Sequence, residues 1–140
     1  MPTTIPPIIG LLDMLEKAER GSRALSDDVL HACGWSVKAG IWRSPCGTTF
    51  NASRPDPTLD LNSALDWVVP AQAYSGIVQK RQREWECYVH NGEPHFTGFA
   101  AQKNPALIWT WLRHTDRCLG LCHAALQFRI ETRRRAGATT

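Results

Sequence analysis

The sequence lacks the features of a membrane-spanning or secreted protein. None of its apolar runs approaches the roughly 20 residues that a helix needs to cross a bilayer. Its first residues hold three prolines and no basic segment ahead of an apolar one, so we expect no secretory signal. We therefore expect a soluble, cytoplasmic protein with no membrane partner.

The common catalytic signatures are also missing. No glycine-rich phosphate loop, GxSxG nucleophile elbow or HExxH zinc motif occurs in the chain. A cysteine–histidine nucleophile would have to combine Cys87 with His90 or His95. Side chains alternate along a strand, so Cys87 and His90 are expected on opposite faces. The sequence thus indicates neither an enzyme nor a cofactor, and favours a protein that acts by binding.

The five cysteines lack the paired spacing of a structural zinc site. An odd number of cysteines without a secretory signal favours free thiols in a reducing compartment. One group could converge on a metal ion if it lies on a helix, namely Cys118 and Cys122 with His114, and His123 beside them. Packing in the core is the simpler interpretation of these side chains, and we predict no metal.

Positive charge is concentrated in the second half of the chain. Residues 1–75 hold six basic and eight acidic side chains, whereas residues 76–140 hold ten and five. The basic side chains cluster at 80–83 and at 133–135. This distribution is found in proteins with anionic partners and equally in solvated turns and frayed helix ends. The sequence pI of 8.7 is slightly below the value of about 9 that marks many nucleic-acid-binding domains.

Apolar residues at three- and four-residue spacing predict a helix over 8–20. Ser26 is expected to cap a second short helix that ends at Gly34, and one or two short strands are expected over 34–57. A third helix is expected to begin at Thr58 or Asp60 and to run through Trp67.

Alternation predicts a β-meander over 74–101, with strands at 74–79, 85–90 and 96–101 and a hairpin signal at Asn91-Gly92. Asn104 and Pro105 then predict the start of a long helix that continues to about Leu119 and is kinked or broken at Gly120. The predicted fold is a small α+β domain, in which an antiparallel sheet of three or four strands packs with N-terminal helices and a long C-terminal helix.

This domain is expected to occupy residues 8–130. A flexible segment precedes it at 1–7, and a basic, flexible tail follows it at 131–140.

Tryptophan is abundant, with six in the chain. Residues two apart on a helix point about 200° away from each other, so Trp109 and Trp111 cannot both enter one core from the predicted helix. The exposed one is then covered by a partner protein, by a second copy in a homodimer, or by the terminal segment of the chain. Tryptophan and arginine are the usual anchors of protein interfaces.

The basic turn offers an alternative binding surface. Lys80, Arg81 and Arg83, with Trp85 and Tyr88 nearby, could neutralise and stack on single-stranded nucleic acid. Such binders place their aromatic side chains on one open sheet face. Trp85 and Tyr88 are expected on opposite faces, which favours the protein partner over nucleic acid.

Three motifs resemble those of a family of small phage and prophage proteins, described as a phage helix–strand–helix (ABA) sandwich domain. The first is the leucine–glutamate helix followed by glycine, serine, arginine and aspartate over 15–28. The second is Asp60-Leu61-Asn62-Ser63-Ala64-Leu65 closing at Val69-Pro70, and the third is Asn104-Pro105-Ala106-Leu107. Asn62 stands where the family has aspartate, and Val69 adds a residue before the proline.

The resemblance implies a context and no mechanism, since the family has no established catalytic residues. It implies a phage-derived accessory protein in a host bacterial cell. Together with the small size, the missing catalytic signatures and the abundance of tryptophan and arginine, this context predicts a protein that acts by binding a host or phage protein. An inhibitor of a bacterial defence complex, similar in action to an anti-CRISPR protein, is the expected function. The alternative is a phage accessory protein that binds nucleic acid. The residues expected to contact the partner are Trp109, Trp111, Trp85, Lys80, Arg81 and Arg83.

Overall fold

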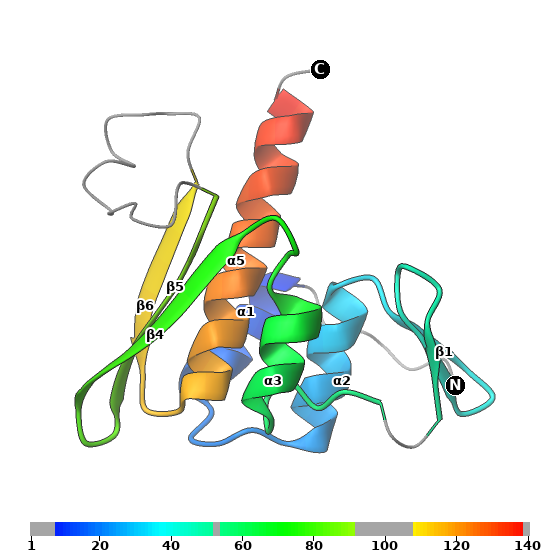
Figure 1. Ribbon diagram of the computed structural model, residues 1–140, viewed down its shortest axis with the longest axis horizontal. Coiled ribbons are helices and arrows are strands. Elements are labelled where there is room, and N and C mark those ends of the chain that lie inside the picture. The colour runs from blue at the N-terminus through cyan, green and yellow to red at the C-terminus, as the bar shows by residue number, and fades with distance from the viewer. Residues whose placement is uncertain (1–7, 52–53, 92–107, 139–140) are drawn as a thin grey trace.

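A computed structural model describes residues 8–51, 54–91 and 108–138 (Figure 1). The helices are α1 (Ile8–Lys17), α2 (Arg23–Ala32), α3 (Leu61–Ser63), its π-helical continuation η1 (Ala64–Val68), and α5 (Arg117–Ala138). The strands are β1 (Ser36–Lys38), β2 (Ile41–Arg43), β3 (Thr49–Phe50), β4 (Tyr74–Arg81), β5 (Glu84–His90) and β6 (Trp109–His114). The α+β class predicted from the sequence is confirmed, although the strands form two antiparallel sheets of three rather than one sheet.

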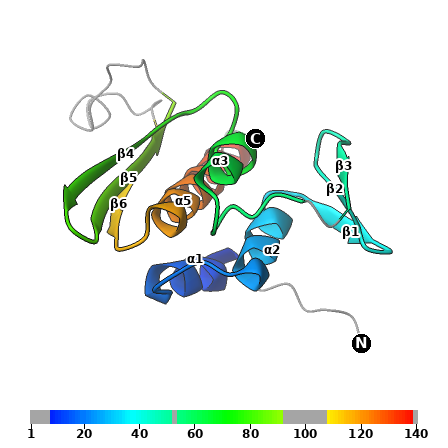
Figure 2. The same ribbon diagram turned by 60° about the horizontal axis from the view of Figure 1, so that its bottom comes forward.

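Helix α5 runs through the middle of the molecule. The β4–β5–β6 sheet covers one side of it, and α1, α2 and η1 lie on the other side (Figure 2). Six residues of this helix between Leu119 and Leu126 have no exposed surface, so nearly every side of it is buried here. Gly120 does not break the helix. A Cβ at this position would lie 2.6 Å from Cys87 Sγ, so glycine lets α5 approach β5 closely.

The helix also continues further than the sequence indicates. It runs through Ala138, so residues 131–138 are helical where a flexible tail was expected. The short helices begin on capping side chains. Asp60 accepts a hydrogen bond from Ser63 N at 3.3 Å at the start of α3, as expected for a cap at that position.

Ser22, and not Ser26, caps α2. Its hydroxyl accepts a hydrogen bond from Leu25 N at 3.1 Å. The prediction of Ser26 as the cap was wrong, because Ser26 lies one turn inside the helix and is fully buried. Its hydroxyl instead accepts from Thr58 N at 3.1 Å and lies 2.7 Å from Thr58 Oγ1. Ser26 therefore holds the segment before α3 against α2.

Strand β6 overturns the largest sequence-based prediction. The long helix expected from Pro105 to Leu119 was wrong over 109–114, because these residues form a strand paired antiparallel with β5, whereas residues 117–119 are helical as predicted. Residues 115–116 then turn the chain, and Asp116 Oδ1 accepts from Cys118 N at 2.8 Å in the manner of a helix cap. The hairpin partner expected at 96–101, the turn at Gly92 and the Asn104-Pro105 helix start lie outside the described residues.

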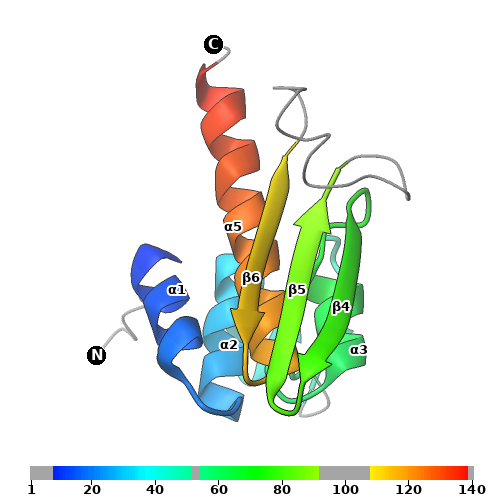
Figure 3. The same ribbon diagram turned by 90° about the vertical axis from the view of Figure 1, so that its left-hand side faces the viewer.

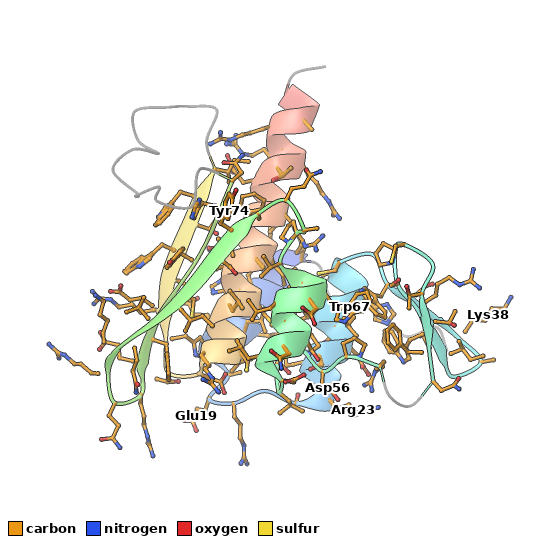
Figure 4. The ribbon with its side chains drawn as sticks, in the orientation of Figure 1. Glu19, Arg23, Lys38, Asp56, Trp67 and Tyr74 are labelled. Carbon is orange, nitrogen blue, oxygen red and sulfur yellow. The ribbon has the colours of Figure 1, made fainter. Side chains whose placement is uncertain are left out.

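The β1–β2–β3 sheet lies on the far side of α2 from the central sheet (Figure 2). Aromatic packing joins it to the body. Trp67 of η1, labelled in Figure 4, points toward the β1–β2–β3 sheet, and its ring centroid lies 5.1 Å from that of Trp35 and 5.4 Å from that of Phe50. Arg54, whose side chain is 3% exposed, donates to Asp27 of α2 at 2.7 Å. Figure 4 also shows Arg23 beside Asp56, at 2.9 Å, at the base of the same region.

Candidate protein-binding groove

The central sheet has one covered face and one outer face. On the covered face, Thr110 Oγ1 donates to Ala124 O of α5 at 2.8 Å, and Val89 and Leu112 belong to the core. The outer face looks toward the viewer in Figure 3, with the described helices behind the sheet. Strand register places Tyr74, Tyr88, His90, Trp109 and Trp111 on this outer face.

Most of these outer rings face one another. The rings of Tyr88 and Trp109 stack at 5.4 Å with an angle of 12° between their planes, and His90 stacks on Trp109 at 5.1 Å. Tyr74 reaches His90 from β4 at 5.5 Å. Such cross-strand pairs stabilise the sheet. They also occupy ring faces that a nucleotide base would need for stacking.

Trp111 lies beside Trp109 on β6, an edge strand of the sheet. It is 44% exposed, and the Arg113 guanidinium lies 5.4 Å from the centre of its ring. Trp109 and Trp111 do not diverge, as the predicted helix required, because residues two apart on a strand share a face. The prediction that one of them is exposed rested on the wrong element, yet an exposed tryptophan is present.

A groove of about 540 Å³ runs beside this edge of the sheet, between β6, α1 and α5. It is lined by Ile9, Leu12, Ile108, Trp109, Thr110, Trp111, Gln127, Ile130, Glu131 and Arg135. Polar and apolar surface line the groove in nearly equal parts, and Ile9 is 75% exposed at its wall. At its end near Trp109, Arg135 donates to Glu131 at 3.0 Å, and hydrogen bonds from Arg134 and Arg135 lower the pKa of Glu131 to about 2.

The backbone groups of β6 alternate in direction along the same groove. Asn91 N donates to Ile108 O, and antiparallel pairing repeats this pattern every second residue. The backbone groups of Thr110 and Leu112 therefore face β5, and those of Trp111 and Arg113 face away from it.

The other predicted contact residues do not join this groove. Trp85 lies on the covered face, opposite His114 at the far end of β6, with the Arg117 guanidinium 5.6 Å from its ring centre. Lys80 and Arg81 end β4, and Arg83 lies in the following turn with a φ of 61°. The structure thus separates these four residues from Trp109 and Trp111.

The basic turn is partly neutralised by its own sheet. Glu86 lies 3.8 Å from Lys80 and 3.4 Å from Arg113, and Arg113 also lies 3.9 Å from Glu84. Sequence reasoning missed these pairs because they join β4, β5 and β6, and it had placed Arg113 in a helix. They reduce the positive potential that a phosphate backbone would meet.

The cysteine and histidine candidates for a metal site occupy separate environments. His114 lies on β6 and not on a helix with Cys118 and Cys122, so the shared helix face expected from the sequence is wrong. Its Nε2 lies 2.8 Å from Leu15 O, and its Nδ1 accepts from Asp116 N at 2.9 Å. Burial raises the pKa of the Cys118 and Cys122 thiols and lowers the pKa of His123. Among the described residues, no group of three or more metal-ligating side chains could hold an ion.

The Cys87–His90 pair has the geometry that the sequence predicts, with the two residues on opposite faces of β5. Burial raises the pKa of the Cys87 thiol to about 12, so the thiolate that a nucleophile requires is strongly disfavoured. His95 lies outside the described residues. This arrangement offers no nucleophile at the sheet.

Cys46 is an exposed thiol with a lowered pKa that sequence reasoning missed. It is exposed in the turn between β2 and β3, where Ser44 Oγ lies 3.1 Å and Thr48 Oγ1 3.5 Å from its sulfur. The hydrogen bonds from Ser44 and Thr48 lower the pKa of this thiol to about 7. The alternation of hydroxyl residues with cysteine over 44–48 was the available signal.

Comparison with known proteins found no match for this chain among protein-family models, curated proteins or solved structures. In the described part of the chain, no helix is both long and apolar enough to span a bilayer.

Proposed function

We propose that this protein acts by binding another protein, and that the groove between β6, α1 and α5 is the docking site. The observation that carries this proposal is an exposed groove that is lined by six apolar and four polar residues and has Trp111 at its rim. Tryptophan residues in or beside an apolar pocket are the commonest anchors of protein interfaces. The side chains of Ile9, Leu12 and Ile130 would exchange water for apolar contacts when a partner docks.

Two observations favour a protein over a nucleic acid as the partner. The faces of the Tyr88, His90 and Trp109 rings are turned toward one another. The cations nearest to them on the outer face pair with Glu84 and Glu86. Single-stranded nucleic acid needs free ring faces and unpaired positive charge along one path.

The class of partner follows from the resemblance to phage proteins, which rests on the sequence motifs alone. We therefore propose a host or phage protein as the partner, with a subunit of a bacterial defence complex as the first candidate.

The test is capture of partners from a bacterial lysate with tagged protein, with and without nuclease, at low and high salt. Two variants with the same change in charge provide the comparison, Ile9→Glu in the groove wall and Met14→Glu on α1 outside the groove lining. Both original side chains are exposed, at 75% and 43%, so neither change is expected to disturb the fold.

We expect a protein that survives nuclease and high salt to be captured by the wild type and by Met14→Glu, and to be lost with Ile9→Glu. Salt screens exposed charges but not apolar contacts, so a docked apolar surface remains bound. Equal capture by Ile9→Glu would contradict the groove as the site. Recovery of nucleic acid alone, lost as salt rises, would contradict a protein partner.

A further inference from the structure

We propose that a second pocket, on the side of α5 away from the groove, binds a small organic molecule that carries one carboxylate on an apolar body. This inference goes beyond the proposed function and does not depend on it. The pocket lies between α5, the segment 70–73 that leads into β4, and the residues at the end of β5 and the start of β6. Its volume is about 470 Å³. Small-molecule sites in proteins commonly have volumes of about 300–1,000 Å³.

The pocket and the groove use different sides of α5. Phe128, Arg129, Thr132 and Arg133 border the pocket, whereas residues 127, 130, 131 and 135 border the groove. At 100° per residue these two sets face opposite directions on the helix. A ligand in the pocket therefore leaves the groove open to a partner.

Apolar surface predominates in the lining of the pocket. Phe128 and Ile108, each 6% exposed, belong to the hydrophobic core and border the pocket from that side. Pro70 and Ala73 add apolar surface from the segment before β4. An apolar ligand body placed here would exchange water for contact with these side chains.

Two arginines supply positive charge at the same pocket. Arg129 and Arg133 are four residues apart on α5, so their side chains share one face of the helix. Arg129 Nε donates to Val68 O at 2.8 Å, which holds this guanidinium beside the pocket. Arg133 is exposed at the rim. The pocket is therefore apolar on the core side and cationic on α5.

This charge is not neutralised within the described part of the chain. No aspartate or glutamate is among the described residues that line the pocket, and neither Arg129 nor Arg133 forms an ion pair with a described carboxylate. The neighbouring Arg134 and Arg135 behave differently, because both pair with Glu131 on the groove side. The pocket thus keeps a cationic wall that the groove lacks.

The combination of surfaces selects the class of ligand. A guanidinium presents its N–H groups as a planar fork that matches the two oxygens of a carboxylate. A small inorganic anion would use this charge and leave the apolar surface exposed to water. A neutral apolar molecule would cover that surface and gain nothing from the arginines. A monocarboxylate with an apolar body uses both.

The experiment follows ligand binding to the intact, isotope-labelled protein by NMR. The probes are octanoate, octanol with the same apolar body and no charge, and acetate with the same charge and almost no apolar body. The reporters are the Arg129 Nε–H and the amides of Ala73 and Phe128. We expect octanoate to shift these signals saturably, and to bind about tenfold or more tightly than either octanol or acetate.

Two variants with the same change in charge separate a defined site from diffuse attraction. Arg133→Gln removes a cation at the pocket, and Arg134→Gln removes the next cation along the helix, on the groove side. Glutamine and arginine have similar helix propensities, so both variants should fold. We expect Arg133→Gln to weaken octanoate binding about tenfold or more, while its affinity for octanol stays the same. Arg134→Gln should leave octanoate binding nearly unchanged.

Four results would overturn the carboxylate site. They are the absence of saturable shifts with octanoate, equal affinities for octanoate and octanol, equal affinities for octanoate and acetate, and equal weakening by the two arginine variants. None of them bears on the groove, since lysate capture with Ile9→Glu and Met14→Glu decides the proposed function separately.

Discussion

The two edges of the central sheet differ in the features that control strand pairing. The β4 edge has a shift in register and two consecutive cations, Lys80 and Arg81. The β6 edge is regular, is occupied by Trp109 and Trp111, and opens onto the groove. Both edges carry a half-exposed aromatic residue, Tyr74 at 43% and Trp111 at 44%. Exposure alone therefore does not distinguish them, and the state of the backbone and the adjoining groove does.

This difference shows how a small sheet can direct association to one side. Charged side chains and register shifts on edge strands hinder pairing with another chain, and the β4 edge has both, whereas the β6 edge is regular and carries Trp109, Trp111 and Arg113. The outer aromatic rings form one continuous row between the two edges, because His90 contacts Tyr74 on one side and Trp109 on the other. The edges can thus be compared within a single fold.

The largest expected effect on the free energy of unfolding comes from weakening the packing of α1, the helix that forms one wall of the groove beside β6. Leu15 of α1 has no exposed surface, and its replacement by alanine should cost about 2–5 kcal/mol of unfolding free energy. Met14→Ala on the same helix removes a half-exposed side chain and should cost far less. Urea denaturation of both variants measures the difference. Equal losses would mean that α1 is not anchored through Leu15.

A smaller effect on stability is expected where α5 packs against β5, the central strand of the sheet. A Cβ at Gly120 would lie 2.6 Å from Cys87 Sγ, so Gly120→Ala should destabilise the protein by about 1–3 kcal/mol. The higher helix propensity of alanine should offset up to about 1 kcal/mol of this loss. Replacing Cys87 by alanine in the same chain removes the clashing sulfur. The double variant should recover part of the loss measured by thermal denaturation. No recovery would contradict the close approach of α5 to β5.

The next effect depends on pH. Burial lowers the pKa of His90 and His123 from the usual value, so the unfolded chain takes up protons more readily than the folded one. Their contribution is therefore fully present above about pH 6.5, the value for an unfolded histidine, and is lost as the pH falls toward the lower folded values. His123→Leu should flatten the fall in stability when urea midpoints are compared above and below that pH. If the stability of His123→Leu depends on pH as that of the wild type does, His123 does not contribute to the fall in stability.

The smallest effect is expected at Cys46, which lies in the separate β1–β2–β3 sheet and serves as a control for both edges. Because its pKa is about 7 and it is exposed, this thiol should react with iodoacetamide well before the four buried cysteines, with half-maximal rate near pH 7. Peptide mapping identifies the site. Alkylation first at Cys33 or Cys118 would contradict the turn geometry. A label on Cys46 should leave partner binding unchanged.

Much of the fold could be predicted from local sequence signals. Spacing of apolar residues predicted the helix at Ile8, capping predicted the start at Asp60, and alternation predicted strand β5. Each of these signals lies within a few residues of the element that it specifies. The choice of Ser22 over Ser26 as a cap could not be predicted, because the contact of Ser26 with Thr58 joins distant segments.

The candidate site was the part most hidden from sequence reasoning. Trp109 and Trp111 were correctly chosen for attention, but the reason given was a helix. The segment 109–114 alternates tryptophan with threonine and leucine, which is a strand pattern. The helix start predicted by Asn104 and Pro105 was given more weight than this pattern. Only the long-range pairing of this segment with β5 decides between the two structures. The groove, whose walls come from α1, β6 and α5, exists only after that pairing.

The comparison between the two edges is tested most directly by measuring partner affinity for Trp111→Ala and Tyr74→Ala. The two variants remove aromatic side chains of nearly equal exposure from the outer face, one at each edge. The account predicts that Trp111→Ala weakens binding of the captured partner by about 2 kcal/mol or more, and that Tyr74→Ala leaves it nearly unchanged. Equal weakening, or weakening by Tyr74→Ala alone, would contradict the β6 groove as the binding site.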